Sequence, residues 1–214
     1  MSGRQKTLPV PYFAQPTGIT CQSTVLKMFA QYLENSVVLR STGAGDREIG
    51  AIWKDINEGP GRPSKFRNAH ANMKWWLEQR FPNLNFEYGT ETMPENVVEK
   101  IVGYVDRGFP VLVAVSHSRV EGHIILVVGY EGYMPNACSG DFRLVVDDPY
   151  GAFDPSLSSK MFGNRRFEGG ASLLSGGQKG PGKEVKLAVD AINRHRKGDA
   201  YFGTYYMLSA TGWK

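Results

Sequence analysis

The stretch VPYFAQPTGITCQSTVLKMFAQYL, residues 10–33, determines how the rest of the chain is interpreted. Its first part is short and interrupted by prolines, which predicts an extended arm rather than a helix. From Cys21 to Leu33, apolar side chains recur every three or four residues, and this periodicity predicts a helix with one buried face. Thr20 is a typical N-cap residue, so the pattern places Cys21 in the first helical turn.

Cys21 is therefore a candidate nucleophile. The start of a helix carries a partial positive charge, which favours a thiolate. Gln15 lies six residues earlier, and its side-chain amide could donate a hydrogen bond to an oxyanion beside the same helix start. A lone cysteine in an amphipathic helix is also a common buried structural residue. The catalytic interpretation therefore requires a base and a group that orients the base.

The order of the remaining elements indicates the fold class. Further helices are predicted over Glu48–Asn57, Ala69–Arg80 and Pro94–Asp106, and β-branched apolar runs predict strands over Pro110–Val115, His123–Tyr130 and Phe142–Asp147. Because the helices come first and the strands follow, the prediction is an α+β fold with an antiparallel sheet. The last part is predicted to contain a long loop, a helix and a strand, over Gly163–Gly182, Val185–Lys197 and Ala200–Ser209 respectively. A length of 214 residues fits a single domain, 1–214, with 152–214 as its basic C-terminal part.

Two of the predicted strands carry residues that could complete a catalytic site. His123 opens an apolar strand, and Asp147 and Asp148 end the next strand directly before a proline. A nucleophilic cysteine needs a histidine base, and the second ring nitrogen of that base needs an orienting partner. The strands supply both, with Asp147 as the reserve for Asp148. His117, in a polar turn, is the alternative base.

Taken together, these segments resemble the papain-like cysteine peptidases of the bacteriocin-processing type. These are the leader-cleaving domains attached to peptide-exporting ABC transporters, together with their stand-alone relatives. The resemblance rests on the spacing of glutamine and cysteine in the quoted stretch, on GHIILVVGY at 122–130 and on VVDDPYG at 145–151. It implies a papain-like fold in which the cysteine lies on the central helix, packed against a sheet that carries histidine and aspartate. The roles it implies are oxyanion donor, nucleophile, base and orienter for Gln15, Cys21, His123 and Asp148 respectively.

The composition argues against a disulfide-rich protein, a zinc protein and a membrane-spanning protein. The two cysteines, Cys21 and Cys138, are expected to be free thiols, and with four histidines in no zinc-binding pattern we expect neither metal nor cofactor. No apolar run approaches the roughly 20 residues that span a bilayer, and the first residues contain no apolar signal segment. We therefore expect a cytoplasmic protein as synthesised, which acts at the cell wall after release.

The net charge of +4 is concentrated near the C-terminus. Between Lys160 and Lys214 the chain has ten Lys or Arg and four Asp or Glu. Over Lys183–Lys197, which includes the helix predicted at Val185–Lys197, an apolar stripe is expected to dock while cations face solvent. The stripe consists of Val185, Ala188, Val189 and Ile192, and the cations are Lys183, Lys186, Arg194 and Lys197.

The favoured function is a cysteine hydrolase of the endolysin type, a phage or bacterial peptidase or amidase that degrades peptidoglycan. Cell walls and envelopes are anionic, so a basic C-terminal part would assist the encounter. A cysteine protease that processes proteins or peptides and an acyl transferase on the same scaffold are alternatives. A non-enzymatic protein that binds nucleic acid through the basic, aromatic C-terminal part is a further alternative. The expected partner is a peptide or peptidoglycan substrate, and the expected oligomeric state is a monomer.

Overall fold

The computed structural model describes residues 4–17, 19–67, 69–117, 120–132, 141–149, 182–192 and 204–214. Helices and strands follow one another in the order β1 (Arg4–Thr7), α1 (Cys21–Tyr32), α2 (Ile49–Glu58), α3 (His70–Arg80), β2 (Leu84–Glu91), α4 (Pro94–Asp106), β3 (Val111–His117), β4 (Val120–Gly132), β5 (Phe142–Asp147), β6 (Val185–Leu187) and β7 (Tyr205–Trp213). A π-helical segment, Leu33–Val38, continues α1. Within the described part, no helix is both long and apolar enough to cross a bilayer.

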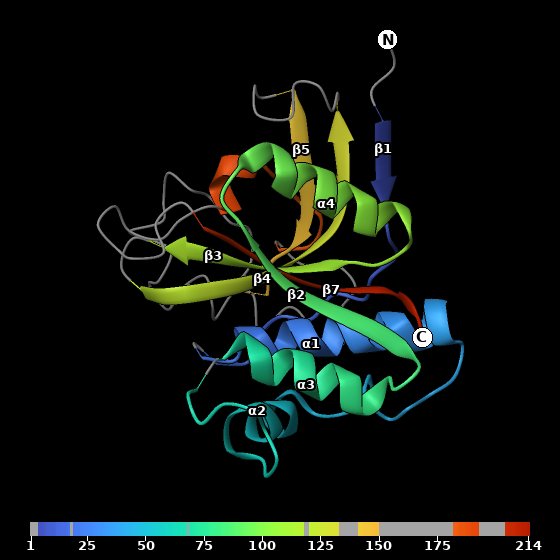
Figure 1. The fold of residues 1–214 in the computed structure, drawn as a ribbon, viewed down its shortest axis with the longest axis vertical. Helices are drawn as coiled ribbons and strands as arrows, with labels where there is room; N and C mark the ends of the chain where they lie inside the picture. The colour runs from blue at the N-terminus through green and yellow to red at the C-terminus, as the bar shows by residue number, and fades with distance from the viewer. Residues whose placement is uncertain are drawn as a thin grey trace.

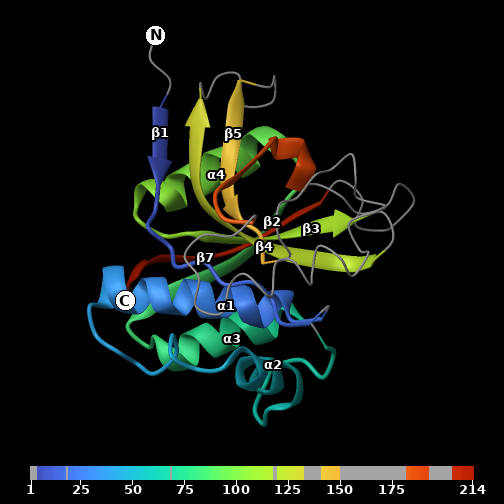
Figure 2. The same cartoon turned by 180° about the vertical axis from the view of Figure 1, so that it is seen from behind.

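The strands form one antiparallel sheet in the order β2-β7-β3-β4-β5-β6, and β1 pairs with the end of β4. Figure 1 shows α1, α2 and α3 stacked together below the strands. Helix α4 lies in front of the strands in Figure 1 and behind them in Figure 2, so it covers one face. The α+β fold with an antiparallel sheet is therefore confirmed.

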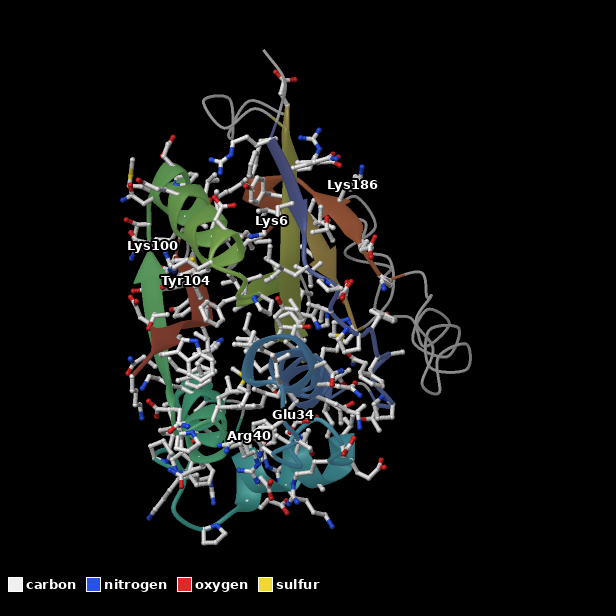
Figure 3. All side chains as sticks on the ribbon, turned by 90° about the vertical axis from the view of Figure 1, so that its right-hand side faces the viewer. Lys6, Glu34, Arg40, Lys100, Tyr104 and Lys186 are labelled. Atoms are coloured by element: carbon white, nitrogen blue, oxygen red, sulfur yellow. The ribbon has the colours of Figure 1, made fainter. Side chains whose placement is uncertain are left out.

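Strand β2 shows how the two faces of the sheet are covered. The ring of Phe86 packs edge-to-face against Phe29 of α1, with ring centroids 6.4 Å apart. The next residue, Glu87, accepts a hydrogen bond from the Tyr104 hydroxyl of α4 at 3.1 Å. Successive residues of a strand point to opposite faces, so α1 and α4 lie on opposite sides of the sheet. Figure 3 shows Tyr104 and Lys100 of α4 beside β2, where Lys100 pairs with Glu91.

The N-terminal segment is fixed along β4. A Cβ atom added at Gly129 would lie 2.3 Å from the Lys6 carbonyl oxygen, so the close approach of β1 requires a glycine there. Lys6 in turn donates to the Asp106 carbonyl at the end of α4 at 2.8 Å, and Figure 3 shows it between β1 and that helix. The arm that carries Gln15 therefore starts from a fixed strand.

The helix predicted over Val185–Lys197 is wrong in the part that is described. Val185–Leu187 is strand β6, which pairs with β5, and a 3₁₀ turn follows at Val189–Ile192. Three residues that pair with an existing sheet gain backbone hydrogen bonds and burial that local periodicity does not encode. Lys186 is exposed and pairs with Glu131 at 2.6 Å, while Val189 and Ile192 are buried as expected.

Other differences lie at the edges of the sheet. Strands β1 and β2 were not expected from the sequence pattern, although β2 forms one edge of the sheet. Residues 193–197, with Arg194 and Lys197, lie outside the described residues. So does the loop predicted over Gly163–Gly182, apart from its last residue.

Candidate active site

Cys21 is the first residue of α1. Thr20 occupies the N-cap position, but its hydroxyl makes no capping bond and instead donates to the Thr17 carbonyl oxygen at 3.0 Å. The N–H groups of the first turn are therefore not capped by this side chain, and a helix start of this kind attracts negative charge. Cys21 is a free cysteine, buried with 7% of its surface exposed.

His123 and Asp148 form a buried pair. The Nε2 atom of His123 lies 2.6 Å from Oδ1 of Asp148, and neither residue is more than 3% exposed. His123 belongs to β4, and Asp148 directly follows the neighbouring strand β5. The antiparallel pairing of these strands brings together two residues that are 25 positions apart in the sequence.

Cys21 and Asp148 act together on the His123 ring. Burial by itself lowers the pKa of His123 because it penalises the charged imidazolium. The negative charge of Asp148, its hydrogen bond and a further hydrogen bond with Cys21 outweigh burial, so the pKa of His123 is raised above its ordinary value. The ring therefore favours the protonated form beside the thiol.

Gln15 is fully buried at the end of the arm. Its backbone N–H donates to the Pro149 carbonyl oxygen at 2.8 Å, which ties the arm to the chain just after Asp148. Its side-chain Nε2 donates one hydrogen to the Thr17 carbonyl oxygen at 2.8 Å. A primary amide has two such hydrogens, and no acceptor is found for the second among the residues that the structure describes.

Two further residues lie next to Asp148, and only the second of them, Asp147, was singled out from the sequence. Tyr12 is buried in the arm, and its hydroxyl donates to the Asp148 carbonyl oxygen at 2.8 Å. Asp147, the reserve orienter, does not bond to His123. Its Oδ1 accepts the N–H of Glu184 at 2.9 Å. Tyr12 was missed from the sequence, and an aromatic hydroxyl in the arm that also carries Gln15 is the one sequence signal that could have pointed to it.

Other candidates from the sequence are only partly described. The side chain of His117 and the whole of Cys138 lie outside the described residues. His70 begins α3 and stacks on Tyr88 of β2, with ring centroids 5.3 Å apart. This histidine is remote in sequence and element from the His123–Asp148 pair.

Comparison with known families covers most of the chain. Residues 7–168 match the family model described as the Peptidase_C39 like family, and this range includes the arm, α1 and the strands with His123 and Asp148. No curated protein matches the sequence closely enough to add to this comparison. The resemblance to papain-like cysteine peptidases is thereby confirmed, and the chain belongs to the Peptidase_C39 like family as a papain-like cysteine peptidase.

Proposed function

We propose that Cys21, His123 and Asp148 act as nucleophile, base and orienter in the hydrolysis of an amide bond through a thioester. The observation that carries the proposal is the buried 2.6 Å pair of His123 and Asp148. Cys21 is among the groups that raise the pKa of this histidine. Asp148 lies beside Nε2, and the proposal assigns the other ring nitrogen, Nδ1, to the thiol. An orienter on one nitrogen and a nucleophile on the other is the arrangement that general base catalysis needs.

The first half of the reaction forms the acyl-enzyme. His123 takes the proton of the Cys21 thiol and becomes an imidazolium. The resulting thiolate attacks the carbonyl carbon of the substrate, and the carbonyl oxygen takes up the negative charge of a tetrahedral intermediate. The imidazolium of His123 then gives its proton to the leaving nitrogen, the carbon–nitrogen bond breaks and the amine departs. The product is a thioester on Cys21 and a neutral His123 ring.

The second half uses water. Neutral His123 takes a proton from a water molecule as its oxygen attacks the thioester carbon, and the carbon–sulfur bond breaks. A carboxylic acid leaves, and the thiolate and imidazolium are restored. Asp148 holds the ring in one orientation throughout.

Gln15 and the Cys21 backbone N–H would stabilise the oxyanion in both halves. One hydrogen of the Gln15 amide is engaged by Thr17, and the second is the donor assigned to the oxyanion. The N–H of Cys21 lies at the start of α1, where the helix dipole also favours negative charge. Buried donors of this kind are already oriented before the charge develops.

For the substrate we propose the peptide part of peptidoglycan, with the enzyme acting as an endolysin-type peptidase or amidase at the cell wall. The supporting observation is the concentration of positive charge between Lys160 and Lys214, where ten basic residues accompany four acidic ones. A cationic part raises the local concentration of an anionic polymer at the enzyme. The catalytic proposal does not depend on this substrate.

The test is incubation of the protein with purified peptidoglycan, followed by mass spectrometry of the released fragments. We expect new amine and carboxylate ends with the wild type and with Cys138→Ser, and none with Cys21→Ala. Cleavage of a peptide library without release from peptidoglycan would favour peptide processing instead. Products extended by an added amine would identify a transferase. Equal release by Cys21→Ala would contradict the catalytic proposal itself.

A further inference from the structure

Asp148 makes its contact with His123 from a backbone that is held at both of its polar groups. Its carbonyl oxygen accepts the Tyr12 hydroxyl at 2.8 Å, and its N–H donates to the Gly182 carbonyl oxygen at 2.8 Å. Tyr12 comes from the N-terminal arm, and Gly182 lies just before β6. Two segments far apart in the sequence therefore fix one aspartate.

Asp147 holds the second of these segments. Its Oδ1 accepts the N–H of Glu184, two residues after Gly182. Glu184 has a φ of 54°, a left-handed conformation that a residue other than glycine adopts only when its surroundings impose it. The Asp147 carboxyl group is the contact that holds this residue, and with it the turn that receives the Asp148 N–H.

The burial of Asp147 does not favour the stability of the fold. The residue is 1% exposed, and its Oδ2 has no hydrogen-bond partner among the described residues. A buried, half-satisfied carboxyl group is costly, and an isosteric apolar side chain would avoid the cost. A role in the neighbouring site explains why the group is there.

Tyr12 is suited to the same task. It is 1% exposed, and burial followed by the charges of Asp148 and Asp147 raises the pKa of its hydroxyl. The hydroxyl therefore remains protonated and can only act as a donor toward the Asp148 carbonyl. Its position in the arm couples Asp148 to Gln15, whose N–H binds the next carbonyl, that of Pro149.

We propose that Tyr12 and Asp147 are positioning residues that hold the two polar backbone groups of Asp148, its carbonyl and its N–H, and so keep its carboxylate on His123. Neither residue touches the reacting atoms in this arrangement. Both act through the backbone of Asp148, Tyr12 directly and Asp147 through the turn at Gly182–Glu184. The inference rests on the proposed function, because it concerns the orienter of the proposed base.

The test measures the state of the His123–Asp148 pair without requiring the natural substrate. The rate at which iodoacetamide alkylates Cys21 is followed against pH in a Cys138→Ser background, so that one thiol reacts. Asp148→Asn removes the charge that raises the His123 pKa, so its alkaline inflection should move to lower pH by about 1–3 pH units. Tyr12→Phe should move the inflection in the same direction by a smaller amount.

Asp147 is tested with a pair of variants. Asp147→Leu removes the acceptor for the Glu184 N–H and should move the inflection to lower pH. Asp147→Asn keeps a carbonyl acceptor at the same place, so its inflection should move by less than that of Asp147→Leu. On a cleavable peptide, kcat should fall about tenfold for Tyr12→Phe, the effect of one net hydrogen bond, while KM stays within twofold.

Tyr32→Phe is the matched control. Tyr32 is also buried, and its hydroxyl donates to a backbone carbonyl, that of Gly108, at 2.9 Å, away from the site. Circular dichroism melts establish that each variant is folded. The proposal is overturned if Tyr12→Phe gives the same pH profile of Cys21 alkylation as Tyr32→Phe. It is also overturned if the inflection moves as far in Asp147→Asn as in Asp147→Leu. An unshifted inflection in Asp148→Asn would instead refute the proposed function, so the two failures are distinguishable.

Discussion

Asp147 and Asp148 are adjacent in the sequence, yet their carboxyl groups have different partners. Asp148 contacts His123, whereas Asp147 accepts the N–H of Glu184. Burial raises the pKa of Asp147 to about 7, and the Glu184 hydrogen bond and the charge of Lys183 only partly oppose it. The two neighbouring carboxyl groups therefore differ in their hydrogen-bond partners: a histidine ring for Asp148 and a backbone N–H for Asp147.

The raised pKa of Asp147 makes stability depend on pH. The native state holds the Asp147 proton up to about pH 7, while the unfolded chain releases it near 3.8. Unfolding therefore becomes easier as pH rises between these values. Asp147→Asn removes this dependence. The free energy of unfolding of Asp147→Asn minus that of the wild type should therefore be larger at pH 8 than at pH 5, by on the order of 2 kcal/mol.

Urea denaturation of both proteins at the two pH values checks this expectation. Because the pKa of Asp147 is higher in the native state than in the unfolded chain, this carboxyl group destabilises the wild type at high pH. A difference between the proteins that is the same at pH 5 and pH 8 would show that Asp147 does not titrate in this range.

Cys21 and Cys138 should differ in reactivity. Cys21 begins α1 and is the proposed nucleophile beside His123, and cysteines at a helix start or next to a histidine are in general the ones that alkylating reagents modify fastest. At pH 7, iodoacetamide should therefore modify Cys21 faster than Cys138 in the native protein, as read by mass spectrometry of peptides. In 6 M guanidinium chloride, both thiols should react at similar rates. Faster native modification of Cys138 would contradict the assignment of Cys21 as nucleophile.

The base and its orienter should differ in what their loss costs. His123→Ala removes the group that transfers protons, whereas Asp148→Ala leaves the imidazole in place but poorly held. We expect both to lower kcat/KM, and Asp148→Ala to retain at least about tenfold more activity than His123→Ala. Steady-state kinetics on a cleavable peptide provide the comparison. Equal losses would mean that the pair acts as one indivisible unit.

At the scale of elements, the N-terminal arm depends on how closely β1 approaches β4. The atom that a Cβ at Gly129 would meet, the Lys6 carbonyl oxygen, belongs to the backbone and cannot rotate away. Further along the arm, Leu8 donates to the Val128 carbonyl at 2.8 Å. The same segment then carries Tyr12 and Gln15 to the site. The position of both residues therefore depends on the pairing of β1 with β4.

Gly129→Ala should displace β1 and disturb the site. We expect a loss of about 1–3 kcal/mol in the free energy of unfolding, as for overpacking, together with a fall in kcat. Gly89→Ala is the control, because Gly89 lies in edge strand β2 and its added Cβ would meet only the Glu87 side chain, at 3.6 Å. That variant should match the wild type in both measurements. Equal melting temperatures for the two variants would show that β1 tolerates displacement.

At the scale of the whole molecule, charge is expected to act on substrate encounter rather than on bond making. Lys186 is exposed on β6, at the edge of the sheet, where Figure 3 shows it away from the stacked helices. Its ion pair with Glu131 partly neutralises it. Most of the basic excess after Lys160 therefore falls to residues outside the described part.

Replacement of Lys186, Arg194 and Lys197 by Gln should weaken binding to peptidoglycan at low ionic strength. At about 0.5 M salt, where the screening length is only a few ångströms, the variant and the wild type should bind alike. Cleavage of a small neutral peptide should not change. Pull-down with insoluble peptidoglycan at several salt concentrations provides the measurement. Loss that persists at high salt would indicate damage to the fold instead of lost attraction.

The sequence by itself determined the features that depend on local pattern. Periodicity placed α1 and α4, because amphipathic spacing reports directly on a buried helix face. Apolar β-branched runs likewise predicted β3, β4 and β5, which contribute many of the buried apolar side chains of the described core. The same local motifs supplied Gln15, Cys21, His123 and Asp148 as candidates.

Only the tertiary structure decided the features that depend on partners distant in the sequence. Val185–Leu187 is a strand because β5 offers it a pairing edge, and no local pattern records that edge. Asp147 and Asp148 lie at the same end of β5, but Asp148 meets His123 whereas Asp147 meets the Glu184 N–H, because successive residues of an extended chain point in opposite directions. The contact of Tyr12 with Asp148 spans 136 positions of the sequence. Such contacts form because folding brings the arm and the sheet together, and a single sequence shows residue types and spacings but not which distant groups meet.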